Sequence, residues 1–395
     1  MPKPAGKYVT IPGGRAFVPD PLPPKLAGSA ELVKAAIDAG HVLGRLAGEG
    51  GRLPDPHLLI RPFVRREAVL SSKIEGTQAT LGQLLADEAG ALVERVPDDL
   101  NEVRNYVVAL EQGVARLGKL PLSLRLMKAL HHTLMKGVRG DRAAPGEFRR
   151  IQNWIGPPGA TVAKARFVPP PPNELAACLD AWEEHLHDHD LPPLLQAALL
   201  HCQFEAIHPF IDGNGRVGRL LITLFLVERE ILPSPLLYLS AFFEATRRDY
   251  YDLLTRVSER SEWEPWVLYF LRGAAHQGKD ALDRVARINA LREQWRRRLA
   301  SRQTRKLMAL LDRITANPFI TVKGASEELG IAFTTAQRTI DALLDHKILV
   351  QINDARRGRV YVAKALLEIL DEPADVIQAE KADRKKRKRR SRQSA

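Results

Sequence analysis

The sequence predicts a mainly α-helical protein with a small β-hairpin on the helical body and a separate C-terminal domain. Apolar residues recur at helical spacing through most of residues 29–302, as in amphipathic helices that pack together. A stretch dense in Gly and Pro at 144–172, with short β-branched pieces, indicates a loop or small hairpin. Over residues 303–370, short strand-like runs alternate with helical ones, which favours a second fold there.

The length and composition indicate a globular protein. At 395 residues the chain can hold two or three domains of roughly 100–200 residues each, and 45% hydrophobic residues suffice for their cores. The two cysteines, Cys178 and Cys202, cannot form a disulfide framework and indicate buried thiols in a reducing compartment. Apolar runs of about 18 residues and the apolar core of a signal peptide are both missing, so we expect a cytoplasmic protein without membrane contact.

The predicted helices follow an N-terminal arm. Residues 1–30 are rich in Pro and Gly and predict an extended arm. The segment after it, ELVKAAIDAGHVLGRLAGEG, has apolar positions at helical spacing and ends in glycines. Further helices are predicted over 56–90, 98–136 and 173–206, and a long Arg-rich connector over 280–312.

The stretch HPFIDGNGRVGR, residues 208–219, follows an apolar helical segment and combines the features of a phosphate site. Gly213 and Gly215 allow backbone N–H groups to approach a ligand closely, just before a helix that begins near Arg216. A helix N-terminus offers unpaired N–H groups and partial positive charge, so it binds phosphate. Arg216 and Arg219 lie three residues apart, on one helix face, and can clamp several phosphate oxygens.

Two further side chains of this stretch indicate chemistry on bound phosphates. Asp212 offers a hard oxygen ligand for Mg²⁺ held between protein and phosphates. His208 is the side chain here that titrates near neutral pH, so it is the candidate general base. The pattern predicts a nucleoside triphosphate site, although it is neither a Walker loop nor a dinucleotide turn. The alternative is an ordinary helix N-terminus with surface arginines. The occurrence of seven such residues at fixed offsets disfavours this alternative.

HPFIDGNGRVGR resembles the signature of the Fic (filamentation induced by cAMP) family, HxFx[D/E]GNGRxxR, with no departure at any fixed position. The resemblance extends over about residues 30–275 and implies a Fic-type helical bundle. It also implies a protein adenylyltransferase that uses ATP and Mg²⁺. Such an enzyme moves AMP to a Ser, Thr or Tyr hydroxyl of a target protein, or of itself, and releases pyrophosphate.

The resemblance also implies roles for single residues. His208 would deprotonate the target hydroxyl, Asp212 would hold Mg²⁺, and Arg216 and Arg219 would hold the outer phosphates. Tyr250 and Tyr251 resemble the tyrosines on the adenine and ribose side, although one of them could be core packing alone. The ATP-binding set implied in this way is Glu75, Asp212, Gly213, Asn214, Gly215, Arg216, Val217, Gly218, Arg219, Tyr250 and Tyr251.

Two segments before the motif resemble parts that surround a Fic site. TVAKARFVPP, residues 161–170, resembles the flap that aligns a target peptide by backbone pairing; the alternative is a surface loop. SSKIEG, residues 71–76, resembles the inhibitory motif [S/T]xxxE[G/N] through Ser71, Glu75 and Gly76. A Glu75 carboxylate on Arg219 would keep that guanidinium from the γ-phosphate and would repel ATP. The alternative for Glu75 is a solvated charge on a helix.

Two rival functions remain open on the same residues. Some members of the family remove AMP, and there the same glutamate positions a water on the modified hydroxyl's phosphodiester. A DNA-binding regulator that uses the Fic domain as a nucleotide sensor is the other rival, which an intact His208 and Asp212 disfavour. Several members pair through helical faces, so a homodimer is open by analogy.

The C-terminal domain resembles a winged helix in its order of helices and strands. TTAQRTIDALLDHK would be the recognition helix, with Thr334, Thr335, Gln337 and Arg338 facing a DNA groove. Arg356, Arg357 and Arg359 would form the wing and contact phosphates. Winged helices also bind proteins, so both kinds of partner remain open.

The basic charge is concentrated at the end of the chain. Residues 381–395 carry nine Lys or Arg and one Asp, a net +8 of the total +12. Such a tail is too polar to fold alone, and it is either a solvated end or a phosphate anchor. We therefore divide the chain into an N-terminal helical region with the inhibitory helix (1–115), a Fic catalytic core (116–275), a helical connector (276–302), a winged-helix domain (303–370) and a disordered basic tail (371–395).

Overall fold

The structure is a computed structural model of the chain. It describes residues 3–52, 56–91, 98–138, 143–157, 159–300, 304–353 and 358–373. The predicted wing residues Arg356 and Arg357, and most of the predicted basic tail, lie outside this part. In the described part, no helix is long and apolar enough to span a membrane.

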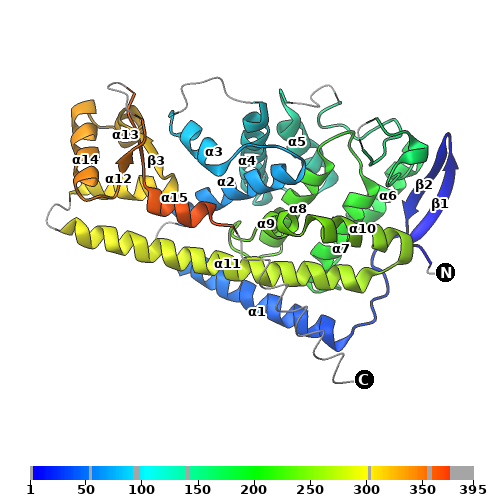
Figure 1. Ribbon diagram of the computed structural model, residues 1–395. Helices are drawn as coiled ribbons and strands as arrows, with labels where there is room; N and C mark the ends of the chain where they lie inside the picture. Colours follow the sequence, from blue (N-terminus) through cyan, green and yellow to red (C-terminus); the bar gives the residue numbers. More distant parts are fainter. Residues whose placement is uncertain are drawn as a thin grey trace.

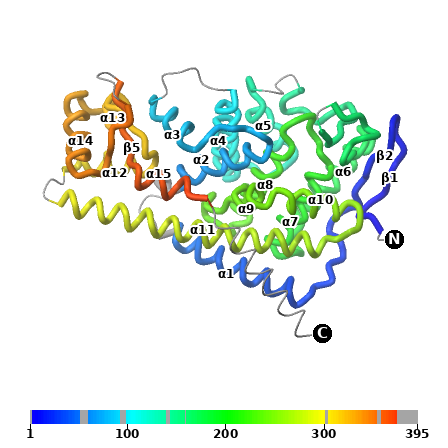
Figure 2. Tube along the Cα trace, in the orientation of Figure 1, coloured from blue at the N-terminus to red at the C-terminus, as the bar shows by residue number. Residues whose placement is uncertain are grey.

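The helical body is built around a long helix and carries a small sheet at one end (Figure 1). Its elements are β1 (Gly6–Ile11), β2 (Gly14–Pro19), α1 (Ala30–Arg52), α2 (Pro56–Ile74), α3 (Leu81–Glu88), α4 (Asp98–Leu117), α5 (Leu124–Met135), the 3₁₀ turn Val162–Lys164, α6 (Pro172–Leu186), α7 (Pro193–Ile207), α8 (Asn214–Glu228), α9 (Ser240–Ala245), α10 (Arg247–Arg260) and α11 (Trp263–Arg298). α11 runs along the molecule, and α1 lies beside it in both views (Figures 1 and 2).

α7 lies in the centre of the body and is buried along most of its length. Two indoles anchor it, because Trp182 Nε1 donates to Leu200 O at 2.9 Å and Trp266 Nε1 donates to Ala198 O at 2.8 Å. α8 packs against α7, α4 and α5. The loop between α7 and α8 therefore starts and ends on two buried helices, which fixes its position.

The predicted N-terminal arm is instead a β-hairpin. β1 and β2 pair antiparallel from Gly6↔Pro19 to Ile11↔Gly14, and Gly13 makes the turn at φ +83°. β2 packs on the helical body: Ala16, Phe17 and Val18 are buried, whereas β1 is more exposed, with Tyr8, the partner of Phe17, 44% exposed. The Pro and Gly content of the arm gave no signal of these strands.

The predicted hairpin in the flap is reduced to a single β-bridge between Ile155 and Phe167. The piece Thr161–Val162, read as strand-like, leads instead into a 3₁₀ turn. Prolines at 169–171 have no N–H to donate, so a longer ladder cannot form there. β2 touches this flap, because Phe17 N donates to Val168 O at 2.8 Å.

The C-terminal domain has the predicted order of elements. It comprises α12 (Arg305–Ala316), β3 (Phe319–Thr321), α13 (Val322–Leu329), α14 (Phe333–Asp345), β4 (Val350–Gln351) and β5 (Val360–Val362), followed by an additional helix, α15 (Lys364–Asp371). The strands form an antiparallel sheet in the order β3-β5-β4. The predicted connector is not a separate segment: residues 276–298 continue α11. The comparison with a winged helix stays a prediction.

Candidate active site

The loop 208–213 joins α7 to α8 with two residues in the left-handed backbone region. His208 ends α7 at φ +50°, and Gly213 precedes α8 at φ +77°. Positive φ is strained for a residue with a Cβ atom, so His208 is held in place by its surroundings. Asn214 supplies part of the hold, because its Nδ2 donates to Phe210 O and its Oδ1 accepts from Phe210 N, both at 2.8 Å. The Asn214 side chain thus braces the loop.

His131 on α5 also braces the loop, a role that the sequence did not predict. Gly146 N–H donates to His131 Nδ1 at 2.8 Å, so the ring proton lies on Nε2, which donates to Asp212 O at 3.0 Å. Its ring stacks on Phe210 with centroids 3.8 Å apart. Burial lowers the pKa of His131 to about 4, so this neutral tautomer persists at neutral pH.

His208 is half-buried and has the protonation state that a base needs. Burial lowers its pKa to about 4, so the imidazole is neutral at pH 7. Its Nδ1 lies 3.3 Å from the carbonyl oxygen of Glu205, which can only accept, so Nδ1 carries the proton. Nε2 is then left with a lone pair that can take a proton from a substrate.

Arg149 ties the flap to the loop and was also missed by the sequence. Its Nε donates to His208 O at 2.9 Å, and its Nη2 donates to Pro170 O at 2.5 Å. Burial lowers the pKa of Arg149 to about 10, which still leaves it charged at neutral pH. An arginine in a Gly- and Pro-rich stretch, with Arg150 next to it, gave no signal of this role.

The two motif arginines are bound by different helices. Arg216 Nη1 pairs with Glu102 Oε2 on α4 at 3.0 Å, and both side chains are almost fully buried. Arg219 is held by α2: its Nε donates to Ser71 Oγ at 2.9 Å, and its Nη2 donates to Ser71 O at 3.0 Å. Each guanidinium is thus fixed at the start of α8 before any ligand arrives.

Glu75 closes the start of α8. Its Oε1 lies 2.6 Å from Arg219 Nη2, and a Cβ atom at Gly215 would lie only 2.3 Å from the same oxygen. Burial raises the pKa of Glu75, but the charge of Arg219 outweighs this effect and the pKa is lowered. Gly76 follows at φ +101°, a conformation that favours glycine and turns the chain after α2. Ser71, Glu75 and Gly76, predicted as one motif, are thus gathered around Arg219.

Asp212 lies on the open side of the loop. Its side chain is 49% exposed, and its Oδ1 accepts from Gly213 N at 2.6 Å. Arg216 Nη2 is 4.0 Å away from that oxygen. The carboxylate therefore keeps oxygen lone pairs that face outwards beside the start of α8.

Three predicted ATP-binding residues face the core instead. Val217 is 1% exposed and its N–H donates to Gly213 O, so neither group is available to a ligand. Tyr250 is fully buried, and its hydroxyl lies 2.9 Å from His201 Nε2. Gly218 O lies 3.1 Å from His201 Nδ1, so Gly218 serves the packing of α7 on α8. Tyr251 is half-buried, with Arg166 over its ring at 5.6 Å, and is the tyrosine of the pair that a ligand can reach.

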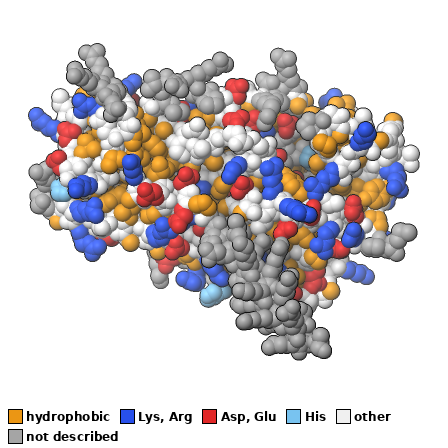
Figure 3. Space-filling model, viewed as in Figure 1, with side chains coloured by type: hydrophobic (Ala, Val, Ile, Leu, Met, Phe, Trp, Pro, Cys, Tyr) orange, Lys and Arg blue, Asp and Glu red, His pale blue; other side chains and the backbone are white. Residues whose placement is uncertain are grey.

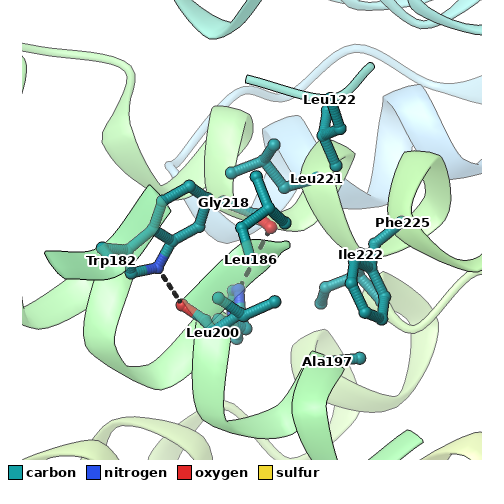
Figure 4. Close-up of a pocket in the computed structure, with 10 residues that line it drawn as sticks. Leu122, Trp182, Leu186, Ala197, Leu200, Gly218, Leu221, Ile222 and Phe225 are labelled. Carbon is teal, nitrogen blue, oxygen red and sulfur yellow. Dashed lines mark hydrogen bonds between the residues drawn. The ribbon is translucent and has the colours of Figure 1, made fainter. Parts of the chain in front are cut away.

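A small apolar cavity lies behind this site, between α6, α7 and α8 (Figure 4). Its volume is about 10 Å³, with walls that include Trp182, Leu200 and Gly218. This is room for one water molecule at most, so the cavity is not a nucleotide site.

Comparison with known proteins identifies the family. The model of the Fic/DOC family N-terminal region matches residues 33–115, and the Fic/DOC family model matches residues 121–226, which include the whole motif. The chain belongs to the Fic/DOC family.

The Fic chain matches curated relatives over part of their length. It is 34% identical over 160 residues to a protein adenylyltransferase Fic of Drosophila virilis, which is 39% of this chain and 31% of that protein. It is 31% identical over 202 residues to the protein of the same name from Drosophila grimshawi, or 50% of this chain and 38% of that protein. The chain thus spans about a third of the length of these relatives.

A solved Fic family protein from Desulfovibrio desulfuricans G20 supports the fold. The two structures superpose with a TM-score of 0.58 at 21% sequence identity, over 87% of this chain and 98% of that chain. At this sequence identity the match supports the helical Fic fold alone. The chemistry has to be inferred from the residues of the site.

Proposed function

We propose that this chain is a protein adenylyltransferase held in an inhibited state by Glu75. The single observation that carries the proposal is the 2.6 Å ion pair between Glu75 and Arg219, at a helix start that also presents a neutral His208. A guanidinium that pairs with a carboxylate cannot also bind a phosphate in the same geometry. The names of the Drosophila relatives support transfer of AMP as the reaction.

The proposed reaction is an in-line displacement at the α-phosphorus of ATP. His208 Nε2 accepts the proton of a Ser, Thr or Tyr hydroxyl on the target protein, and the hydroxyl oxygen bonds to the α-phosphorus. The bond from that phosphorus to the bridging oxygen breaks, and pyrophosphate leaves. The N–H groups at the start of α8, together with Arg216 and Arg219 once Glu75 has moved, would neutralise the phosphate charge.

Asp212 is suited to hold Mg²⁺ together with the phosphates. In the described part of the chain no three acidic, His or Cys side chains form a metal cage, but Mg²⁺ often binds one carboxylate, phosphate oxygens and water. The exposed lone pairs of Asp212 meet that need. Bound there, the ion would neutralise charge on the phosphates while the protein residues act as described.

One labelling experiment separates the proposal from its rivals. Wild type, Glu75→Gly and Glu75→Gly/His208→Ala are incubated with Mg²⁺ and α-labelled ATP, alone and with a cell lysate. Transfer predicts label in protein for Glu75→Gly that is lost when His208 is also replaced. Loss of AMP from a pre-modified protein would support the hydrolase instead. Bound nucleotide without either reaction would support the sensor.

The C-terminal domain is a candidate DNA-binding surface. Thr334 and Arg338 on α14 are exposed, whereas Ala336 and Ile340 point into the domain, and Arg359 is exposed beside β5. Lys and Arg side chains gather at the end of the molecule where α11 meets this domain (Figure 3). A protein partner for this face is the alternative.

Duplex DNA binding to the full chain tests this surface by fluorescence anisotropy. We expect affinity to fall steeply with salt and Arg338→Ala to weaken binding by about tenfold or more. The matched control is Arg248→Ala, a 93% exposed arginine on α10. Salt-independent binding, or an equal effect of both variants, would favour a protein partner.

A further inference from the structure

Glu205 lies in the last turn of α7, three residues before His208, and no sequence pattern singled it out. Its Oε1 atom is buried and has no hydrogen-bond partner among the described residues. A buried carboxylate oxygen without a donor is destabilising, and such exceptions in folded proteins need a reason, such as a ligand that supplies the donor.

Two carboxylates lie against a face of α8 that carries no side chains. A Cβ atom at Gly218 would lie 2.5 Å from Glu205 Oε1, and one at Gly215, nearly a turn earlier, would lie 2.3 Å from Glu75 Oε1. Glycine at both positions therefore lets one carboxylate from α7 and one from the end of α2 reach the helix. Glu75 has a partner in Arg219, whereas Oε1 of Glu205 has none in the described part of the chain.

The polar neighbours of Glu205 are bound elsewhere. Arg219 and Tyr250 lie within electrostatic range of its carboxylate, but Arg219 donates to Ser71 and Glu75. The hydroxyl of Tyr250 lies against His201, which is buried and neutral. Glu205 therefore supplies a hydrogen-bond acceptor, and the matching donor has to come from a bound ligand.

In a nucleoside triphosphate, the hydrogen-bond donors lie on the nucleoside and not on the triphosphate. At neutral pH the triphosphate offers acceptor oxygens, whereas the ribose hydroxyls and the amino group of adenine can donate. We propose that Glu205 Oε1 accepts a hydrogen bond from a hydroxyl or amino group on the nucleoside half of the bound nucleotide. Glu205 thereby determines which nucleotides the site accepts. The assignment rests on the proposed nucleotide site.

Equilibrium binding tests the assignment without requiring activity. Glu75→Gly protein is titrated with a fluorescent ATP analogue, which is then displaced by ATP, 2′-deoxyATP, 3′-deoxyATP or purine riboside triphosphate, which lacks the amino group. We expect at least one of the three analogues to bind at least about tenfold more weakly than ATP, and that analogue identifies the donor.

Substitutions at Glu205 complete the test in the same Glu75→Gly background. The measured quantity is the ratio of the affinity for ATP to the affinity for the weakest-binding analogue. Glu205→Ala should reduce this ratio to less than about twofold, whereas Glu205→Gln, which keeps an oxygen acceptor, should retain most of it. The control is Glu67→Gln: Glu67 is a buried carboxylate on α2 whose Oε1 already bonds to Tyr106 and Ser240, so the ratio should not change.

Three outcomes are distinguishable. Equal affinity of Glu75→Gly protein for ATP and all three analogues overturns the assignment, and so does an unchanged ratio in Glu205→Ala. Absence of any nucleotide binding overturns the proposed function, and the assignment with it. Melting temperatures show whether the variants are folded. If Glu205→Ala is not folded, the test relies on Glu205→Gln.

Discussion

At the scale of single residues, the proposed site combines a neutral candidate base with an arginine whose guanidinium is already paired. His208 is neutral with a free Nε2, while Arg219 is bound by Glu75 and Ser71. The motif itself predicted both residues, since the residue types and spacing already indicate a base and a clamp. It could not predict Arg149, His131 or Glu205, because their roles depend on contacts with segments far away in sequence.

The pH dependence of AMP transfer tests the state of His208. The active form is neutral, and burial lowers the pKa of the folded group to about 4, so activity is lost only as pH falls towards that value. We expect kcat/KM of Glu75→Gly to stay flat from about pH 8 to about pH 5.5, whereas an imidazole at its ordinary pKa would lose half its activity near 6.5. An acid limb centred near pH 6.5 would contradict this environment for His208.

At the scale of elements, α2 and the turn after it form the proposed brake, and α8 is the element that they would block. The sequence predicted α2 from its apolar stripe and α8 from its strongly apolar run after the motif. It did not predict the β1–β2 hairpin or the loss of the flap hairpin, since Pro and Gly content gives the same signal for an arm, a turn and a loop.

Ser71→Ala tests the contribution of α2 to the brake. The change removes the hydroxyl that accepts from Arg219 Nε but leaves the backbone carbonyl and Glu75 in place. We expect AMP transfer to rise by roughly threefold to tenfold, less than in Glu75→Gly. The control is Ser72→Ala, because the adjacent hydroxyl is buried and has no hydrogen-bond partner among the residues that the structure describes. Equal rates for the two variants would mean that the Ser71 hydroxyl does not contribute to the brake.

At the scale of the whole molecule, the C-terminal domain rests on the helices that carry the brake. α12 and α15 pack against α2, and Asn317 Nδ2 donates to Leu85 O on α3 at 2.9 Å. Arg66 on α2 donates to the carbonyl of Glu372 after α15 at 3.3 Å. The sequence predicted this domain and its order of elements but not its docking, because side chains such as Asn317 show no periodic pattern.

Asn317→Ala tests whether the docked domain steadies α2. The change removes a buried hydrogen bond between the domain and α3, so we expect faster hydrogen exchange in α2 and α3 and a two- to fivefold rise in basal AMP transfer. Gln337→Ala on α14, whose side chain donates to Asp341 in its own helix, is the control. If α2 exchanges at the wild-type rate in Asn317→Ala, the domain and the brake are independent.

The central claim is that a working transferase site is closed by the carboxylate of Glu75, and intact mass tests it most directly. Purified wild type, Glu75→Gly and Glu75→Gly/His208→Ala are incubated with Mg²⁺ and ATP, and the intact mass of each protein is then measured. The control is Glu88→Gly, which removes a comparably exposed carboxylate that also pairs with a buried arginine, Arg65. We predict a gain of one AMP in Glu75→Gly alone. A gain in the double variant, or none in Glu75→Gly while ATP still binds, would contradict the account.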